Sequence, residues 1–337
     1  PLRPNLSNAE YNTSNYHYPT STGIKFSSLG GSETYIYMAI RAPMMKEPEV
    51  ATEVFALSNA VGGASTSVGF VPDTVLFTNT TQANGTRYLT NRITGKRQLR
   101  ANTTNAESSL VVDWDAPSGT WKQGQDSSNI NLFWKRAKGY MDVVAYNGTS
   151  AARTQTHSLG VAPEMIWVKS RNATEQWGVY HIALGNTKYL QLHTTAGASV
   201  ANFWNNTSPT DSVFSLGSID ESNGNNKQYV AFLFATLAGI SKVGSYTGNG
   251  SYQTINCGFS AGARFILIKR TDNSLYNWYV FDTVQGIVAG NDPHFQLDTG
   301  SSTTNIDVVD PHSSGFIVNN HGEVNTSGGT YIFYAIA

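Results

Sequence analysis

Gly160-Val-Ala-Pro-Glu-Met-Ile-Trp-Val-Lys169 combines two turn-forming residues with an apolar run that ends at a lysine. A related stretch, Gly258-Phe-Ser-Ala-Gly-Ala-Arg-Phe-Ile-Leu-Ile-Lys269, follows it, and a weaker version, Gly69-Phe-Val-Pro-Asp-Thr-Val-Leu-Phe77, precedes it. The three opening glycines recur about every 95 residues, which is the length of a small domain. The sequence therefore predicts one domain-sized module that is repeated in tandem.

A second string recurs with the same period and marks the end of each module. It reads Tyr35-Ile-Tyr-Met-Ala-Ile40, and similar β-branched and aromatic residues return at 129–134, 229–234 and 331–336. Short strings of this kind without a helical period predict buried strands. No opening strand precedes the first copy, so residues 1–42 are expected to be an N-terminal arm and the back half of an incomplete module. Either the chain is a piece of a longer protein or another subunit supplies the front half.

Three full modules are expected after this arm: a first at 43–138, a second at 139–240 and a third at 241–337. The second and third share a fuller template, in which a strand after a polar turn carries Trp177 or Trp278. Strand alternation places each tryptophan on the same face as the valine two residues later. The first module lacks this Trp strand, so we expect it to have diverged.

The central strand of the second module is apolar on both faces, with Met165 and Trp167 on one face and Ile166 and Val168 on the other. Each module offers several short strands and no convincing helix to cover them. Such a strand must therefore pack against a second sheet or a neighbouring module. The sequence predicts an all-β protein built of tandem antiparallel β-sandwich modules of jelly-roll, concanavalin-like type, joined by short linkers.

The composition excludes several classes of partner. Charged residues are 13% of the chain, about half of the usual share of roughly 25%, and the net charge is -1. No basic surface for nucleic acid or an anionic membrane is therefore expected, and no apolar run is long enough to insert into a membrane. The single cysteine, Cys257, is interpreted as a packed thiol rather than a nucleophile.

Catalytic and metal-binding patterns are weak. The seven histidines show no metal-ligand spacing, and neither a nucleophile elbow nor a phosphate-binding loop is present. The remaining candidates also fit a simpler reading as turn formers or solvated loop residues. They are Asp292-Pro-His294, Asp310-Pro-His312, and the carboxylate pairs Asp113 with Asp115 and Asp220 with Glu221. We therefore expect no enzymatic activity, no cofactor and no metal.

Aromatic residues in polar loops point to binding instead. Trp121, Trp204, Tyr252 and Tyr276 lie among Gly, Ser, Asn and Thr, where a ring can stack on a sugar and amides can bond its hydroxyls. The alternative is that half or more of these rings pack against the sandwich. These four residues are the predicted binding residues.

Several strings together resemble a β-sandwich module that occurs, often in tandem, in virion proteins of marine tailed phages, notably cyanophages. They include Tyr146-Asn-Gly-Thr149, Leu159-Gly-Val-Ala-Pro-Glu-Met-Ile-Trp-Val-Lys169, the ending Asn325-Thr-Ser-Gly-Gly-Thr-Tyr-Ile-Phe-Tyr-Ala-Ile-Ala337 and the linker Ala39-Ile-Arg-Ala-Pro-Met-Met-Lys46. The resemblance covers residues 23–337, although each motif is only a strand with a turn. It implies a lectin-like jelly-roll on the exterior of a virion, and it carries no catalytic residues.

The resemblance leads to a function as an expectation. The chain is expected to be a non-enzymatic virion structural protein, a tail fibre or appendage that adheres to host-surface glycans. The alternatives are a capsid decoration or scaffold protein without a ligand and, third, a glycan-cleaving tailspike. Expected partners are further copies of the chain, for example in a trimer, and other virion proteins, besides host glycans.

Overall fold

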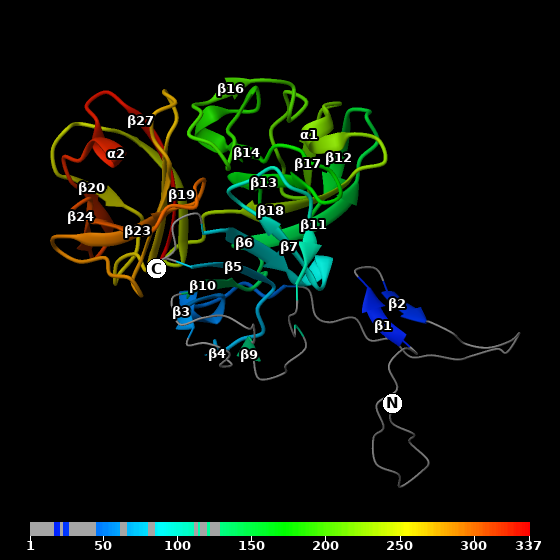
Figure 1. Ribbon diagram of the computed structural model, residues 1–337, viewed down its shortest axis with the longest axis horizontal. Helices are drawn as coiled ribbons and strands as arrows, with labels where there is room; N and C mark the ends of the chain where they lie inside the picture. Colours follow the sequence, from blue (N-terminus) through cyan, green and yellow to red (C-terminus); the bar gives the residue numbers. More distant parts are fainter. Residues whose placement is uncertain are drawn as a thin grey trace, which may run out of the picture. The chain divides into compact units, whose positions relative to one another are not determined.

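The computed structural model describes residues 17–20, 23–26, 45–60, 66–79, 85–110, 114, 120–121 and 129–337. The chain divides into two units, Pro1–Pro43 and Met44–Ala337. In the first unit, β1 (His17–Thr20) and β2 (Gly23–Phe26) form an antiparallel hairpin (Figure 1). The closing strand expected at 35–40 lies outside the described residues.

The first module contributes a six-stranded antiparallel sheet with the order β3-β10-β5-β6-β7-β8, and the short strands β4 and β9 pair separately. Two single-turn 3-10 helices, Ala51–Glu53 and Arg92–Thr94, flank this sheet. The strands are β3 (Phe55–Ala60), β4 (Thr66–Ser67), β5 (Thr74–Asn79), β6 (Arg87–Asn91), β7 (Arg97–Arg100), β8 (Ser108–Ser109), β9 (Thr120–Trp121) and β10 (Asn129–Trp134).

The second module contains a four-stranded sheet with the order β11-β18-β13-β14 and two small sheets, β12-β17 and β15-β16. Its helices are the 3-10 turn Ile182–Leu184 and the single turn α1 (Asp220–Asn223). The strands are β11 (Met141–Asn147), β12 (Arg153–Thr156), β13 (Met165–Ser170), β14 (Gly178–His181), β15 (Lys188–Tyr189), β16 (Ser199–Val200), β17 (Val213–Leu216) and β18 (Gln228–Phe234).

The third module repeats this plan with a six-stranded sheet, β19-β27-β21-β22-β23-β24, and a three-stranded one, β20-β26-β25. The strands are β19 (Ser241–Thr247), β20 (Gln253–Asn256), β21 (Phe265–Arg270), β22 (Trp278–Asp282), β23 (Asp292–Gln296), β24 (Thr304–Ile306), β25 (Val309–His312), β26 (Gly315–Val318) and β27 (Thr330–Ile336), with α2 at Gly322–Asn325. The described part of the chain is thus mostly β, with antiparallel sheets in several modules and very little helix, as expected.

The two faces of the central strand β13 belong to two different cores. Ile166 and Val168 pack inside the second module, in a cluster that also contains Phe214 of the small sheet. Met165 and Trp167 face the other way, into a cluster that continues into the first and third modules. The sequence left open whether such a strand packs on a second sheet or on a neighbouring module, and it does both.

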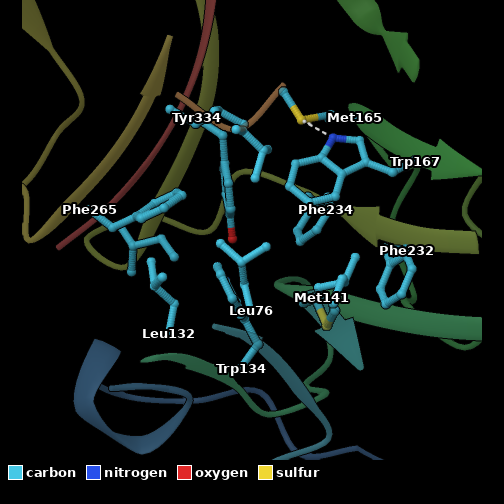
Figure 2. Packing of buried hydrophobic residues seen from close by; sticks show 14 of the residues in the cluster. Leu76, Leu132, Trp134, Met141, Met165, Trp167, Phe232, Phe234, Phe265 and Tyr334 are labelled. Carbon is cyan, nitrogen blue, oxygen red and sulfur yellow. Dashed lines mark hydrogen bonds between the residues drawn. The ribbon is translucent and has the colours of Figure 1, made fainter. Parts of the chain in front are cut away.

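The shared core joins all three main sheets of the second unit (Figure 2). Its aromatic contacts cross the module boundaries: the ring centroids of Phe55 and Phe265 lie 5.6 Å apart, and those of Phe234 and Tyr334 lie 5.0 Å apart. Trp134 completes the group, with its ring 5.7 Å from that of Phe265. Burial of this apolar surface requires all three modules together, so they form one compact unit.

The closing strands contribute equivalent positions to the shared core, because each pairs with its central strand in the same register. One face of each strand supplies three consecutive alternate residues. These are Ile130, Leu132 and Trp134 in β10, Val230, Phe232 and Phe234 in β18, and Ile332, Tyr334 and Ile336 in β27. The sequence repeat therefore places one equivalent face of each module at the centre.

Two smaller expectations concern the thiol and the membrane. Cys257 is buried, and this burial raises the pKa of its thiol to about 12, which agrees with a packed residue rather than a nucleophile. In the ranges that the structure describes, no helix has the length and apolar character that a membrane span needs.

Candidate functional site

Hydrogen bonds from two tryptophan rings connect successive modules. Trp177 Nε1 donates to the carbonyl oxygen of Arg100 in the first module, at 2.9 Å. Trp278 Nε1 donates to the carbonyl oxygen of Gln191 in the second module, also at 2.9 Å. Both rings are fully buried, so each bond satisfies an indole N–H that has no access to water.

Arg87 replaces the tryptophan in the first module. It begins β6 and pairs with Thr78, just as Trp278 begins β22 and pairs with Lys269. Its Nε donates to the carbonyl oxygen of Gln296 in the third module at 2.9 Å. The first module lacks the tryptophan, as expected, but the strand itself is present as β6, and an arginine makes the contact to the neighbouring module. The three contacts together close a ring of modules.

Buried cations lie beneath these contacts. Lys169 and Lys269 occupy equivalent positions and are fully buried. Lys269 Nζ donates to the carbonyl oxygens of Thr195 and Tyr276, at 2.7 and 2.5 Å, and so links the second module to the third. Burial lowers the pKa of both lysines to about 8, because an ammonium loses hydration inside the protein.

The seam between the first and second modules is closed by an ion pair. The Glu107 N–H donates to the Arg171 carbonyl oxygen at 2.7 Å. The Arg171 guanidinium in turn donates two bonds to the Glu107 carboxylate, at 2.8 and 3.0 Å. Two parallel bonds of this kind hold both side chains in place, and the side chains fill the boundary between the two modules.

The seam between the second and third modules carries small residues at the same positions and is open. The Ala198 N–H donates to the Thr271 carbonyl oxygen at 2.8 Å, which repeats the backbone bond of the first seam without its ion pair. Beside it, Gly197 approaches so closely that an added Cβ would lie 2.9 Å from the Asn273 carbonyl oxygen. A cleft of about 770 Å³ remains, lined by residues of both modules.

The edge strand β19 forms one wall of this cleft, which Ser245 and Thr247 line. The Val243 N–H donates to Thr236 Oγ1 at 3.1 Å and therefore points away from the paired strand β27. Because peptide groups alternate along an antiparallel strand, those of Ser245 and Thr247 also point away from β27. The wall thus offers backbone donors and acceptors as well as hydroxyl groups.

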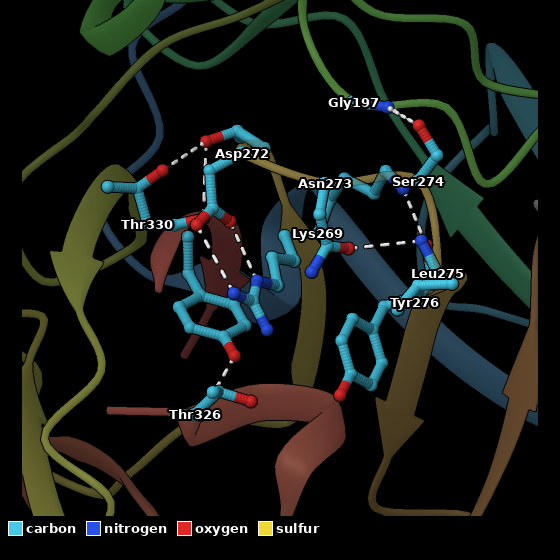
Figure 3. A network of polar contacts seen from close by, with 12 residues as sticks. Gly197, Lys269, Asp272, Asn273, Ser274, Leu275, Tyr276, Thr326 and Thr330 are labelled. Carbon is cyan, nitrogen blue, oxygen red and sulfur yellow. Dashed lines mark hydrogen bonds and ion pairs between the residues drawn. The ribbon is translucent and has the colours of Figure 1, made fainter. Parts of the chain in front are cut away.

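The turn after β21 contributes a fixed polar pair, which Figure 3 shows with its surroundings. Arg270 Nε and Nη2 donate to the two carboxylate oxygens of Asp272, at 2.7 and 3.2 Å. The guanidinium carbon also lies 5.2 Å from the ring centre of Tyr276 and 5.9 Å from that of Tyr331. The bond to Arg270 is the main cause that lowers the pKa of Asp272, so its carboxylate is ionised.

The predicted binding residues differ in their exposure and in their position relative to the cleft. Trp204 is 1% exposed and packs in the core of the second module, so the expectation of an exposed ring is wrong for this residue. Its Nε1 instead donates to the carbonyl oxygen of Lys188, a residue that lines the cleft. Tyr252 is 61% exposed, as expected of a loop aromatic, but it does not line the cleft. The side chain of Trp121 lies outside the described residues.

Tyr276 does not line the cleft. Its ring packs on Arg270 and its carbonyl oxygen accepts from Lys269, so it supports the turn that holds Asp272. The sequence placed Asp272 and Asn273 in a recurring polar turn but did not select them, because the cleft exists only where two modules meet. The polar turn that recurs after the central strand was the sequence feature that could have pointed to these two residues.

Among the other candidate residues, Asp292 and Asp220 have structural partners. Asp292 is buried and accepts from the N–H groups of Val288, Val308 and Val309. The Asp220 carboxylate bonds Lys227, and Asp113 and Asp115 are outside the described residues. Within the described residues, no group of three or more His, Cys, Asp or Glu side chains is placed to hold a metal ion.

Comparison with protein-family models identifies a family for this chain. Residues 135–337 match the family model DUF7483, described as a domain of unknown function. This range contains the second and third modules and the cleft between them. A search of curated proteins finds none that matches the chain.

Proposed function

Because the chain belongs to the DUF7483 family, a domain of unknown function, we propose its function from the structure and the sequence. It is a non-enzymatic structural protein of a phage virion, a tail fibre or appendage that adheres to glycans on the host surface. The jelly-roll type of its sandwiches and its place on the exterior of the particle follow from the resemblance to modules of marine tailed phages. Self-association, for example as a trimer, and attachment to other virion proteins belong to the same proposal.

The cleft between the second and third modules is the observation that carries the proposal. Its volume of about 770 Å³ falls in the range of roughly 300–1,000 Å³ that is usual for small-ligand sites. Serine, threonine, asparagine and aspartate make up about half of its lining residues, and two of them, Ser245 and Thr247, belong to the edge strand β19. A sugar carries many hydroxyl groups that each need a donor or an acceptor, and such a surface supplies both.

The rigid core supports adhesion, because binding then costs little ordering of the protein. A single sugar site is usually weak, whereas several copies on one particle raise the avidity by about 10²–10⁴. A glycan array probed with the full chain tests the proposal, with binding to at least one glycan class expected. A blank array at millimolar sugar would contradict adhesion, and release of reducing ends from a bound glycan would show a tailspike enzyme instead.

A capsid decoration or scaffold protein is the second candidate, and the shared core favours it. A single core that joins three modules gives a stiff body suited to reinforcing a shell. Cryo-electron microscopy of the particle separates the candidates. Density on the capsid lattice, rather than at the tail, would replace the adhesin with the decoration protein.

A further inference from the structure

We propose that the cleft between the second and third modules recognises a saccharide through two adjacent hydroxyl groups, one donating to Asp272 and the other accepting from Asn273. This inference rests on the proposed glycan adhesion. It adds the ligand chemistry and the residues that hold the ligand.

Asp272 is fixed before any ligand arrives. Arg270 holds both carboxylate oxygens, and Tyr276 and Tyr331 in turn hold the Arg270 guanidinium. Although backbone N–H groups also favour its ionised form, 36% of the Asp272 side chain remains exposed. A carboxylate offers about four acceptor positions; Arg270 takes two, and the N–H groups of Asp272 and Thr330 also approach its oxygens. The exposed oxygen surface can therefore accept a ligand hydroxyl without rearrangement of the site.

Asn273 supplies the complementary donor. Its Oδ1 accepts from the Leu275 N–H at 3.0 Å, and this bond fixes which end of the amide is the oxygen. The amide nitrogen, Nδ2, is then the group left to donate. Asn273 follows Asp272 in the same turn, as Figure 3 shows, and both are among the residues that line the cleft. An acceptor beside a donor matches two neighbouring hydroxyl groups, since each hydroxyl both donates and accepts.

The other lining residues of the cleft favour the same ligand class. Ser245 and Thr247 of β19 supply hydroxyl groups, and their peptide groups point away from β27. Lys188 adds an ammonium from the second module. An extended peptide can also pair with such an edge strand. A peptide bound there would rely on backbone bonds to β19 and would not need Asp272 or Asn273. The paired acceptor and donor therefore favour the saccharide.

The cleft between the second and third modules is open because no ion pair fills it. At the equivalent seam, Arg171 and Glu107 fill the space that Thr271 and Ala198 leave empty here. Ala198→Glu places a longer acidic side chain at the cleft and is expected to block it. It is a test that does not alter the Asp272–Asn273 turn.

The experiment measures binding of the full chain to the saccharide that a glycan array identifies. Asp272→Asn and Asn273→Asp are each expected to weaken binding by at least about tenfold, since the first removes a hydrogen bond to a charged group and the second replaces the amide donor by an acceptor. Ala198→Glu is expected to abolish it. Asp211→Asn, an exposed change outside the cleft lining, is the control and should bind as the unaltered chain does. Melting temperatures verify that each variant is folded.

Each outcome separates the two proposals. If a glycan binds and the cleft variants bind it unchanged, the cleft assignment is overturned and adhesion stands. If no saccharide binds the unaltered chain, adhesion itself fails and the cleft assignment fails with it. If Asp272→Asn does not fold, Ala198→Glu decides, because unchanged binding by that folded variant overturns the assignment. Binding of an extended peptide that competes with the glycan and is unchanged by Asp272→Asn would identify a peptide site.

Discussion

Trp278 Nε1 donates a 2.9 Å hydrogen bond to the carbonyl oxygen of Gln191, which lies one module earlier in the chain. Trp177 repeats this contact to Arg100, and Arg87 joins the first module to the third. Every module thus donates to one neighbour and accepts from the other. The three contacts enclose the shared core and make the modules interdependent.

Trp167→Ala is expected to lower the free energy of unfolding by about 3–5 kcal/mol, because it leaves a cavity in the shared core. Trp167 is 3% exposed and its ring lies 4.9 Å from that of Phe234. Denaturant unfolding followed by circular dichroism measures the change. Val200→Ala, at a position that is 76% exposed, is the matched control and should change little. An unchanged midpoint for Trp167→Ala would contradict its place in the core.

Arg87→Trp is expected to destabilise the chain, and the double variant Thr78→Lys with Arg87→Trp to recover part of the loss. The single change removes the donor for the carbonyl oxygens of Gln296, Ser301 and Asn79, and a buried unsatisfied group costs about 1–3 kcal/mol. The double change installs the Lys–Trp pair of the other two modules. A double-mutant cycle in urea should show coupling of about 0.5–3 kcal/mol.

Strict additivity of the two changes would show that the Lys–Trp pair does not transfer between modules. All urea unfolding midpoints are measured at one pH, because the pKa values of Lys169 and Lys269 are about 8 and their charge therefore depends on pH in that range. Thr78→Lys alone completes the cycle.

Gly197→Ala is expected to loosen the seam between the second and third modules. Its Cβ would lie 2.9 Å from the Asn273 carbonyl oxygen and 3.0 Å from that of Thr271, and backbone atoms cannot move aside easily. A loss of about 1–3 kcal/mol is expected from such overpacking. Ser199→Ala, two residues further along the same wall, is the control. Hydrogen exchange at Ala198 should speed up only in the glycine variant, and equal protection in both would contradict the close approach.

Stability is expected to fall as the pH drops from about 6.5 to about 4. Burial lowers the pKa of His181 and of His193 to about 4, so in this window the unfolded chain binds protons that the folded chain does not. The slope is about 1.4 kcal/mol per pH unit for each histidine, and their contribution is constant above pH 6.5. Urea midpoints measured across the window test this.

A matched variant isolates the two histidines. Asp298 acts in the opposite direction, because burial raises the pKa of its carboxyl to about 6 and the folded chain gains that proton first. His181→Gln with His193→Gln should therefore flatten the acid slope while the Asp298 contribution remains. Parallel curves for the variant and the unaltered chain would contradict the role of the histidines.

The periodicity of the strands was readable from the sequence because it is local. Trp177 and Val179 were expected on one face, as were Trp278 and Val280, and all four lie in the shared core. The two apolar faces of β13 were likewise correct. The Trp204 ring was misjudged, because its polar neighbours in sequence are not its main neighbours in space, where its ring centroid lies 5.6 Å from that of Tyr180.

The sequence by itself determined a mostly β chain of repeated modules, since strand alternation and repeat length depend only on residues near one another. Only the tertiary structure decided that the modules share one core and that Arg87 occupies the position of the tryptophan in the other two modules. It also decided that the boundary between the second and third modules stays open. These features depend on pairs such as Trp177 with Arg100 and Arg87 with Gln296, which are 77 and 209 residues apart. Contacts over such separations arise from packing of whole sheets, and no local pattern encodes them.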